Sequence, residues 1–176
     1  MKLADIVGGK VVIHPNLLII PPFKKLWESS DEKNHVQDII TYIVFNNRWD
    51  SPYVLTTFDD EERASKLKEK ILGSKDYELT AEEKACEQEY IELQHTDLLQ
   101  MLENMRKKLN SFSKYYGDSL DEELDEKKIE KYLAGFGKVK DAYITLNYLE
   151  KAIKAGELDN SKVRGDAKVN PYELVR

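Results

Sequence analysis

The side chains that most often carry out chemistry in proteins are few in this sequence and far apart. Its three histidines, His14, His35 and His95, lie in separate segments, and no HExxH motif occurs. Zinc sites usually draw on histidines or cysteines a few residues apart, so we expect no metal site and no cofactor. Spacing alone does not rule out a nucleophile–histidine–acid triad, but no nucleophile motif such as GxSxG is present. We therefore expect no catalytic residues and no enzyme activity.

The single cysteine, Cys86, excludes an intramolecular disulfide and a multi-cysteine zinc site. Its surroundings, EEKACEQEY, are acidic, and neighbouring carboxylates disfavour the reactive thiolate form. We expect a packing cysteine, which suits a reducing compartment.

Glycine-rich and acid-rich stretches are the remaining candidates for a binding site. The GGK at residues 8–10 lacks the flanking residues of a phosphate-binding loop, and AGFG at residues 134–137 is better explained as a break between helices. The acidic runs at residues 59–62 and 121–126 lack the spaced oxygen ligands of a calcium loop. Acids of this kind are favourable at helix N-termini, where they interact with the helix dipole.

The composition indicates elongated amphipathic helices. The chain has 176 residues, of which 41% are hydrophobic and 34% charged, with a net charge of −6. Because basic and acidic residues are interleaved without a basic block, we expect no sequence-specific binding to nucleic acid. The apolar run at residues 11–20 is far shorter than the roughly twenty apolar residues of a membrane-spanning helix, so we expect no membrane segment.

The N-terminal residues read as an extended arm. Residues 1–22 contain two short aliphatic runs, KVVI and NLLII, separated by His14-Pro15 and stopped by Pro21-Pro22. The residue before a proline avoids the helical conformation, so we expect this stretch to lie outside the folded body. A short helix then begins near Phe23.

The centre of the chain is predicted to be a helical bundle spanning residues 23–156. Helices are expected over residues 31–47 and 59–72, the second ended by Gly73, and over residues 138–155. The final residues 157–176 lack an apolar face and are predicted to form an extended C-terminal arm. The fold class is therefore all-α, an elongated helical bundle with two arms.

The clearest prediction is one long helix over about residues 80–116. Thr80 and Glu83 form a capping-box pattern, and no proline or glycine follows until Gly117. Apolar side chains then recur every three or four residues over 91–116, which is the period of a coiled-coil seam. Packing inside a bundle and pairing with a second chain both account for this seam.

Residues 14–54 carry a resemblance to a known family. The stretch HPNLLIIPPFKKLWE, followed by a helix that ends in YIVF and by an SPY loop, resembles virion proteins of tailed bacteriophages, particularly of crAss-like podophages. The resemblance implies a head-to-tail adaptor, a small helical protein that forms a ring, usually of twelve copies, beneath the portal. It also implies contacts with the portal and with other tail proteins, assembly in the host cytoplasm, a place at the portal vertex of the virion, and DNA passing through the ring.

The two predicted arms supply the expected partner-binding residues. Extended arms bind neighbours by strand addition or through apolar anchors. The anchors expected are Val12, Ile13, Leu18, Ile19, Phe23, Trp27, Tyr172, Leu174 and Val175. The alternative hypothesis is a soluble coiled-coil regulatory module that dimerises through the seam at residues 91–116.

Overall fold

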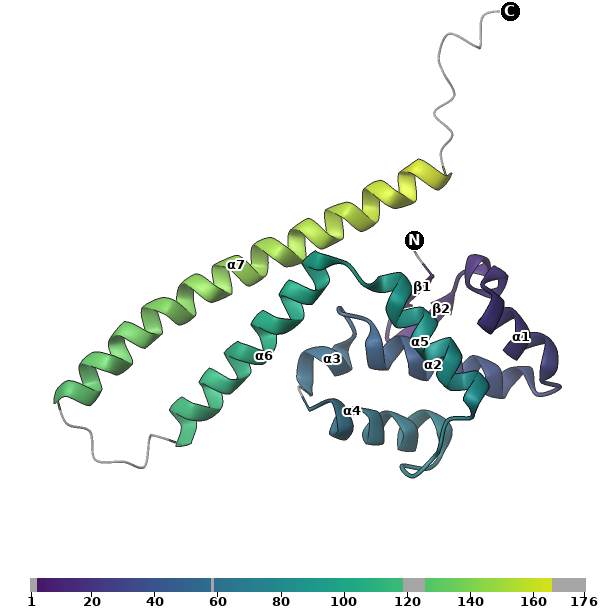
Figure 1. The fold of residues 1–176 in the computed structure, drawn as a ribbon, viewed down its shortest axis with the longest axis horizontal. Coiled ribbons are helices and arrows are strands. Elements are labelled where there is room, and N and C mark those ends of the chain that lie inside the picture. The colour runs from purple at the N-terminus through teal and green to yellow at the C-terminus, as the bar shows by residue number, and fades with distance from the viewer. Residues whose placement is uncertain (1–2, 58, 119–125, 166–176) are drawn as a thin grey trace, which may run out of the picture. The chain divides into compact units, whose positions relative to one another are not determined.

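The computed structural model describes residues 3–57, 59–118 and 126–165. These residues are mainly helical with one two-stranded sheet, so the all-α class is confirmed (Figure 1). The chain divides into two compact units, residues 1–95 (unit 1) and residues 96–176 (unit 2). The prediction of a single bundle over residues 23–156 is therefore wrong, because the chain leaves the helical conformation at His95 and Thr96.

Unit 1 begins with a β-hairpin. Strands β1 (Ala4–Val7) and β2 (Lys10–Ile13) pair in antiparallel fashion. Gly8 and Gly9 connect them with φ angles of 57° and 75°, the positive values that a two-residue turn between twisted strands requires. The cross-strand pairs Ala4–Ile13 and Ile6–Val11 face the core of unit 1.

The predicted N-terminal arm is therefore part of the folded body. Its residues form the hairpin, the 3₁₀ helix η1 (Pro15–Ile19) and the start of α1 (Pro21–Ser29). Leu3, Ala4 and Leu17 are at most 1% exposed. The Arg48 guanidinium also donates to the Ala4 carbonyl. Burial and this hydrogen bond hold the segment against the unit.

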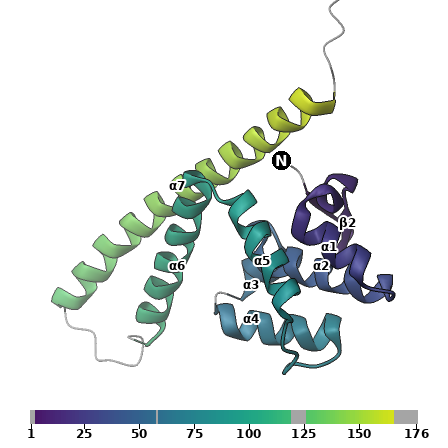
Figure 2. The ribbon, with the colours of Figure 1, turned by 45° about the vertical axis from the view of Figure 1, so that its right-hand side comes forward.

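Helix α2 (Lys33–Asn47) is the central element of unit 1 and packs against α1, α3, α4 and α5 (Figure 2). Its apolar residues recur with helical spacing, and four of them, Ile39, Ile40, Ile43 and Val44, are completely buried. The helix predicted over residues 31–47 is thus confirmed. Apolar side chains from α1 and the hairpin complete the core.

Two short helices and a wider turn follow α2. Ser51 caps α3 (Pro52–Thr56), and Asp59 caps α4 (Asp60–Leu67) by accepting from the backbone amides of Glu61 and Glu62. Helix α4 continues into a π-helical turn, η2 (Lys68–Leu72), which stops at Gly73 with a φ of 79°. The helix expected over residues 59–72, with a glycine end, is confirmed.

The long helix predicted over residues 80–116 is interrupted. Helix α5 (Ala81–Gln94) begins with the expected capping box of Thr80 and Glu83. It ends at His95, whose backbone is extended, and α6 (Asp97–Asp118) starts anew. The Thr96 hydroxyl accepts from the amide of Leu99 at 3.2 Å, so Thr96 caps a second helix and separates the two units.

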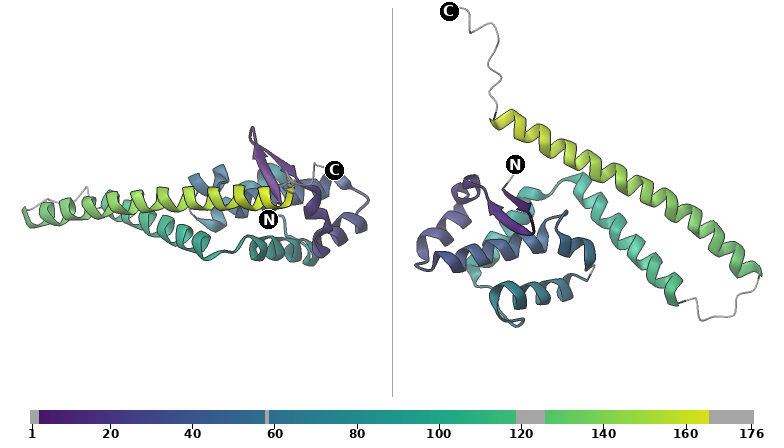
Figure 3. Two further views of the ribbon diagram at one scale, coloured as in Figure 1. Left: turned by 90° about the horizontal axis from the view of Figure 1, so that it is seen from above. Right: turned by 180° about the vertical axis from the view of Figure 1, so that it is seen from behind.

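Unit 2 is a pair of helices, α6 and α7 (Glu126–Gly165). They run in opposite directions, and they draw apart toward the C-terminal end of α6 (Figures 1 and 3). The two helices contact each other. Leu102 of α6 and Leu146, Leu149 and Ile153 of α7 are buried apolar residues of this unit. The predicted break at residues 134–137 does not occur.

The predicted C-terminal arm is also corrected in part. Helix α7 continues through residues 157–165, so these are helical and not extended. Residues 166–176 lie outside the described part of the chain.

Candidate interaction surfaces

A histidine, a tyrosine and a glutamate form the most site-like cluster of unit 1. The Tyr77 hydroxyl lies 3.1 Å from His35 Nε2 and donates to Glu83 Oε1 at 3.1 Å. Burial, with further contributions from the hydrogen bond to Glu83 and its negative charge, raises the pKa of Tyr77 to about 12. A tyrosine with so high a pKa keeps its proton near neutral pH, which makes it a poor general base.

The geometry of this cluster indicates a structural role. Glu83 Oε2 also accepts from the backbone amide of Thr80 at 2.8 Å, so its carboxylate is committed to the capping box of α5. His35 lies in the first turn of α2, and Tyr77 lies in the loop before α5. The three side chains thus join that loop to α2.

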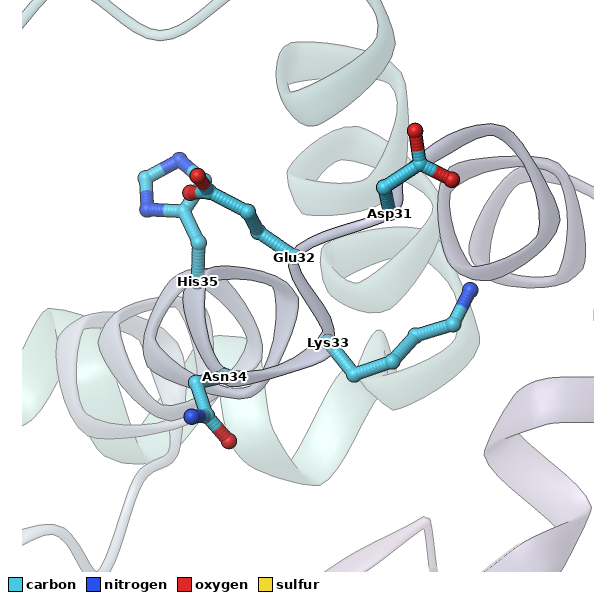
Figure 4. A pocket seen from close by; sticks show the side chains of 5 residues that line it. All are labelled: Asp31, Glu32, Lys33, Asn34 and His35. Carbon is cyan, nitrogen blue, oxygen red and sulfur yellow. The ribbon is translucent and has the colours of Figure 1, made fainter.

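An open pocket adjoins the same histidine. It is lined by Asp31, Glu32, Lys33, Asn34 and His35 at the junction of α1 and α2. Their side chains point in different directions instead of toward a common point (Figure 4). Lys33 turns back toward α1, where its ammonium group donates to the Ser30 carbonyl at 2.7 Å and lies over the Trp27 ring. These contacts fasten the α1–α2 turn and provide no convergent site for a ligand.

The other residues considered for chemistry also serve the fold. Cys86 is fully buried, and this burial, with the charges of Glu83 and Glu82, raises the pKa of its thiol to about 12. His14 Nε2 lies 2.9 Å from Asp5 Oδ2 beside the hairpin. Within the described residues, no group of three His, Cys, Asp or Glu side chains is arranged to hold a metal ion.

Buried charge is used to join helices of unit 1. Arg63 of α4 is 9% exposed and donates to the backbone carbonyls of Asn46 and Thr57, both at 3.1 Å, and to Asp60 at 2.9 Å. The Asn46 amide in turn donates to Glu87 of α5 at 3.2 Å. The cluster links α2, α4 and α5, and all of its members have partners.

The anchors predicted from the sequence do not share one environment. Val12 and Ile19 are exposed, at 50% and 72%. Ile13, Leu18 and Trp27 are partly buried against the core. Phe23 is completely buried, so its prediction as a surface anchor is wrong: the first turn of α1 directs it into unit 1. The three remaining anchors, Tyr172, Leu174 and Val175, lie outside the described residues.

Helix α7 carries an exposed surface that was not among the expected partner-binding residues. Lys140, Ile144, Tyr148 and Lys151 recur at helical spacing, opposite the side that carries Leu146 and Leu149. We call these four residues the α7 outer face. Ile144 is 58% exposed and Tyr148 is 70% exposed, and Tyr143, beside them, is 55% exposed. The sequence signal was present, because apolar residues on two opposite sides of a helix indicate burial on both.

The predicted 91–116 seam is divided between the two units. Ile91 belongs to α5, whereas Leu98 and the residues after it belong to α6. Leu102 is fully buried within unit 2, but Leu98, Met101 and Phe112 are between 44% and 50% exposed. One continuous dimer seam is therefore not formed.

No helix in the described residues is long and apolar enough to cross a lipid bilayer. Comparison with known proteins does not add an assignment. No protein-family model, curated protein or solved structure matches this chain.

Proposed function

We propose that this chain is a structural assembly protein and not an enzyme: a ring-forming connector at the portal–tail junction of a tailed bacteriophage. Its partners are further copies of itself, the portal protein and neighbouring tail proteins. Its place is the portal vertex of the virion, after assembly in the host cytoplasm.

The observation that carries the proposal is the exposed apolar surface of unit 2. In a pair of helices, each helix packs against the other along one side only, and its remaining sides stay exposed. In unit 2 the exposed sides of α7 carry Tyr143, Ile144 and Tyr148. Clustered exposed aromatic and aliphatic side chains mark surfaces that bind other proteins. Together with the His35–Tyr77–Glu83 and Arg63 clusters, which join elements of unit 1, a surface of this kind favours assembly over catalysis.

The resemblance over residues 14–54 gives the proposal its specific form. This stretch runs from η1 to α3 and contributes Leu17, Phe23 and most of the buried residues of α2 to the core. It therefore supplies most of the buried apolar residues of unit 1. The family it resembles consists of small helical ring proteins, and unit 1 has the helical composition expected of such a protein.

The proposal is tested by producing the chain alone and together with the products of the neighbouring genes, followed by electron microscopy. Rings with a central opening, alone or on a portal-like partner, support it. A discrete two-fold dimer that does not bind those partners contradicts the proposal and favours the alternative of a regulatory module. Removal of residues 166–176 then tests the C-terminal segment: normal incorporation of the shortened chain excludes that segment as a partner-binding arm.

A further inference from the structure

We propose that the α7 outer face binds an acidic surface on unit 1 of a second copy, in a head-to-tail contact that repeats from copy to copy. The acidic surface consists of Leu55 of α3 and the four acids Asp59 to Glu62 at the start of α4. The inference rests on the proposed ring function and names the surfaces that would build the ring.

The charge of the chain is unevenly distributed. Residues 1–95 account for the whole net charge of −6, because acidic and basic residues are equal in number over residues 96–176. Within unit 2, α6 and α7 each contain more Lys and Arg than Asp and Glu. Contact between the basic helices of one copy and the acidic unit 1 of the next is therefore favoured by charge.

The α7 outer face has the composition of an interface. Ile144 and Tyr148 are one helical turn apart and more than half exposed, and exposed lysines precede and follow them at positions 140 and 151. Apolar and aromatic residues framed by charge are typical of a protein-binding patch with a polar rim. Lysines in such a rim would select an acidic partner and accelerate association.

The acidic surface offers a matching composition on unit 1. Leu55 is 45% exposed, and Asp59, Asp60, Glu61 and Glu62 are four successive exposed acids at the start of α4. Asp60 and Glu62 already pair with Arg63 and Lys66 on the same helix. Even so, residues 59–62 themselves contain no base, so negative charge is concentrated there, four residues after an exposed leucine.

The same charges disfavour the alternative of a two-fold contact. Symmetric pairing of two α7 outer faces would place lysines against lysines, since each copy presents the same surface. Like charges brought together at an interface oppose binding. A head-to-tail contact pairs unlike surfaces, and such contacts close into rings when the rotation between copies permits it.

Sedimentation equilibrium of the full-length chain at low and high ionic strength tests the inference. The wild type is expected to self-associate reversibly, and more weakly as salt screens the charges. Variant A carries Lys140→Glu and Lys151→Glu, and variant B carries Glu61→Lys and Glu62→Lys. Each alone is expected to raise the dissociation constant about tenfold or more. An equimolar mixture of A and B should restore association, because each reversed surface meets its reversed counterpart.

Two controls keep the charge change and move its position. Lys108→Glu with Lys138→Glu alters exposed lysines of α6 and α7 outside the outer face, and Glu69→Lys with Glu78→Lys alters exposed acids outside the acidic surface. Both controls should associate like the wild type. Ile144→Ser with Tyr148→Ser should abolish association at every salt concentration, and far-ultraviolet circular dichroism confirms that the variants fold.

The remaining outcomes overturn the inference. If variant A lost association and variant B did not, the α7 outer face would bind a surface other than residues 59–62. Failure of the A and B mixture to associate would exclude pairing of these two surfaces, and so would a wild type that stays monomeric. Binding of duplex DNA by the α7 outer face in place of self-association would assign it a nucleic-acid partner. In each of these cases the ring proposal is decided separately, by electron microscopy with the partner proteins.

Discussion

The guanidinium of Arg106 donates a hydrogen bond to Glu150 Oε1 across 2.7 Å, joining α6 to α7. Their side chains are only 8% and 25% exposed, and Leu102, Leu146 and Leu149 supply the buried apolar residues of the same unit. The pair therefore fixes how the two helices of unit 2 meet.

Loss of this hydrogen bond should destabilise unit 2. A hydrogen bond to a charged group contributes about 1.5–3 kcal/mol, so Glu150→Ala should lower the free energy of unfolding of unit 2 by that amount. Hydrogen–deuterium exchange of peptides from α6 and α7 measures the change, and peptides from unit 1 serve as an internal reference. Glu103→Ala, at an exposed site of α6, is the control. An equal loss of stability in this variant would show that the Arg106–Glu150 pair makes no special contribution.

The Arg63 cluster should be the most sensitive polar site of unit 1. Arg63→Ala leaves the buried carbonyl of Asn46 without its donor, and we expect a loss of about 3 kcal/mol in the free energy of unfolding. Arg63→Lys should rescue little, because an ammonium group cannot reach several acceptors in the fixed geometry of a guanidinium. Guanidinium chloride denaturation followed by circular dichroism measures both.

An exposed pair on the same helix provides the comparison. Lys66 contacts Glu62 at 2.5 Å, and both side chains are more than half exposed. Lys66→Ala should therefore cost no more than about 0.5 kcal/mol. Similar losses for Lys66→Ala and Arg63→Ala would show that the buried cluster is not a special contributor.

Two glycines should respond in opposite ways to alanine. Gly137 lies inside α7, and no neighbouring atom comes within 4 Å of the position that an added methyl group would occupy, so Gly137→Ala should stabilise unit 2 by about 0.5–1 kcal/mol. Gly73 has a φ of 79° at the end of η2, and Gly73→Ala should cost about 1 kcal/mol or more. Thermal unfolding compares them, and a destabilising Gly137→Ala would argue against a continuous α7.

Stability should fall at high pH because of Tyr77. Its pKa is raised from 10.0 to about 12 in the folded protein, so the unfolded chain releases the proton first as pH rises. The stabilisation is complete below pH 10 and is lost between about pH 10 and 12. The pKa values of Tyr42 and Cys86 are also raised to about 12. Only part of the loss of stability at high pH is therefore due to Tyr77. Tyr77→Phe should show a shallower decline in the melting temperature over this range, and an unchanged slope would contradict the assignment.

Sequence patterns predicted elements whose causes are local. The capping box of Thr80 and Glu83, the acid-capped start of α4 and the end at Gly73 all depend on neighbours within a few residues, and all three were confirmed. The apolar period of α2 likewise predicted its buried side.

The sequence predictions failed where an element depends on residues far away in the chain, or where local signals for and against a helix are of similar strength. The N-terminal segment is held by Arg48, which lies 44 residues away from Ala4 in the chain. The glycines of residues 134–137 cost only about 1 kcal/mol each in a helix, too little to end α7. The break after Gln94 had a local signal, since Thr96 followed by Asp97 is itself a pattern for a helix start, but the long apolar period concealed it.

The candidate surfaces were harder to predict than the helices. Phe23 was expected at a surface and is buried, whereas Tyr143 is exposed and was not among the expected partner-binding residues. The burial of Phe23 and the exposure of Tyr143 depend on which other elements pack against each helix. The spacing of apolar residues predicts a helix but does not indicate which elements pack against it.

Native mass spectrometry of the full-length protein with its portal-side partner tests the central claim most directly. Each copy has a mass of 20.5 kDa, so the number of copies in a complex can be counted from its mass. A connector should give one closed complex with a fixed number of copies well above two. A chain that remains a monomer or a dimer, with and without the partner, would contradict the assignment as a ring-forming assembly protein.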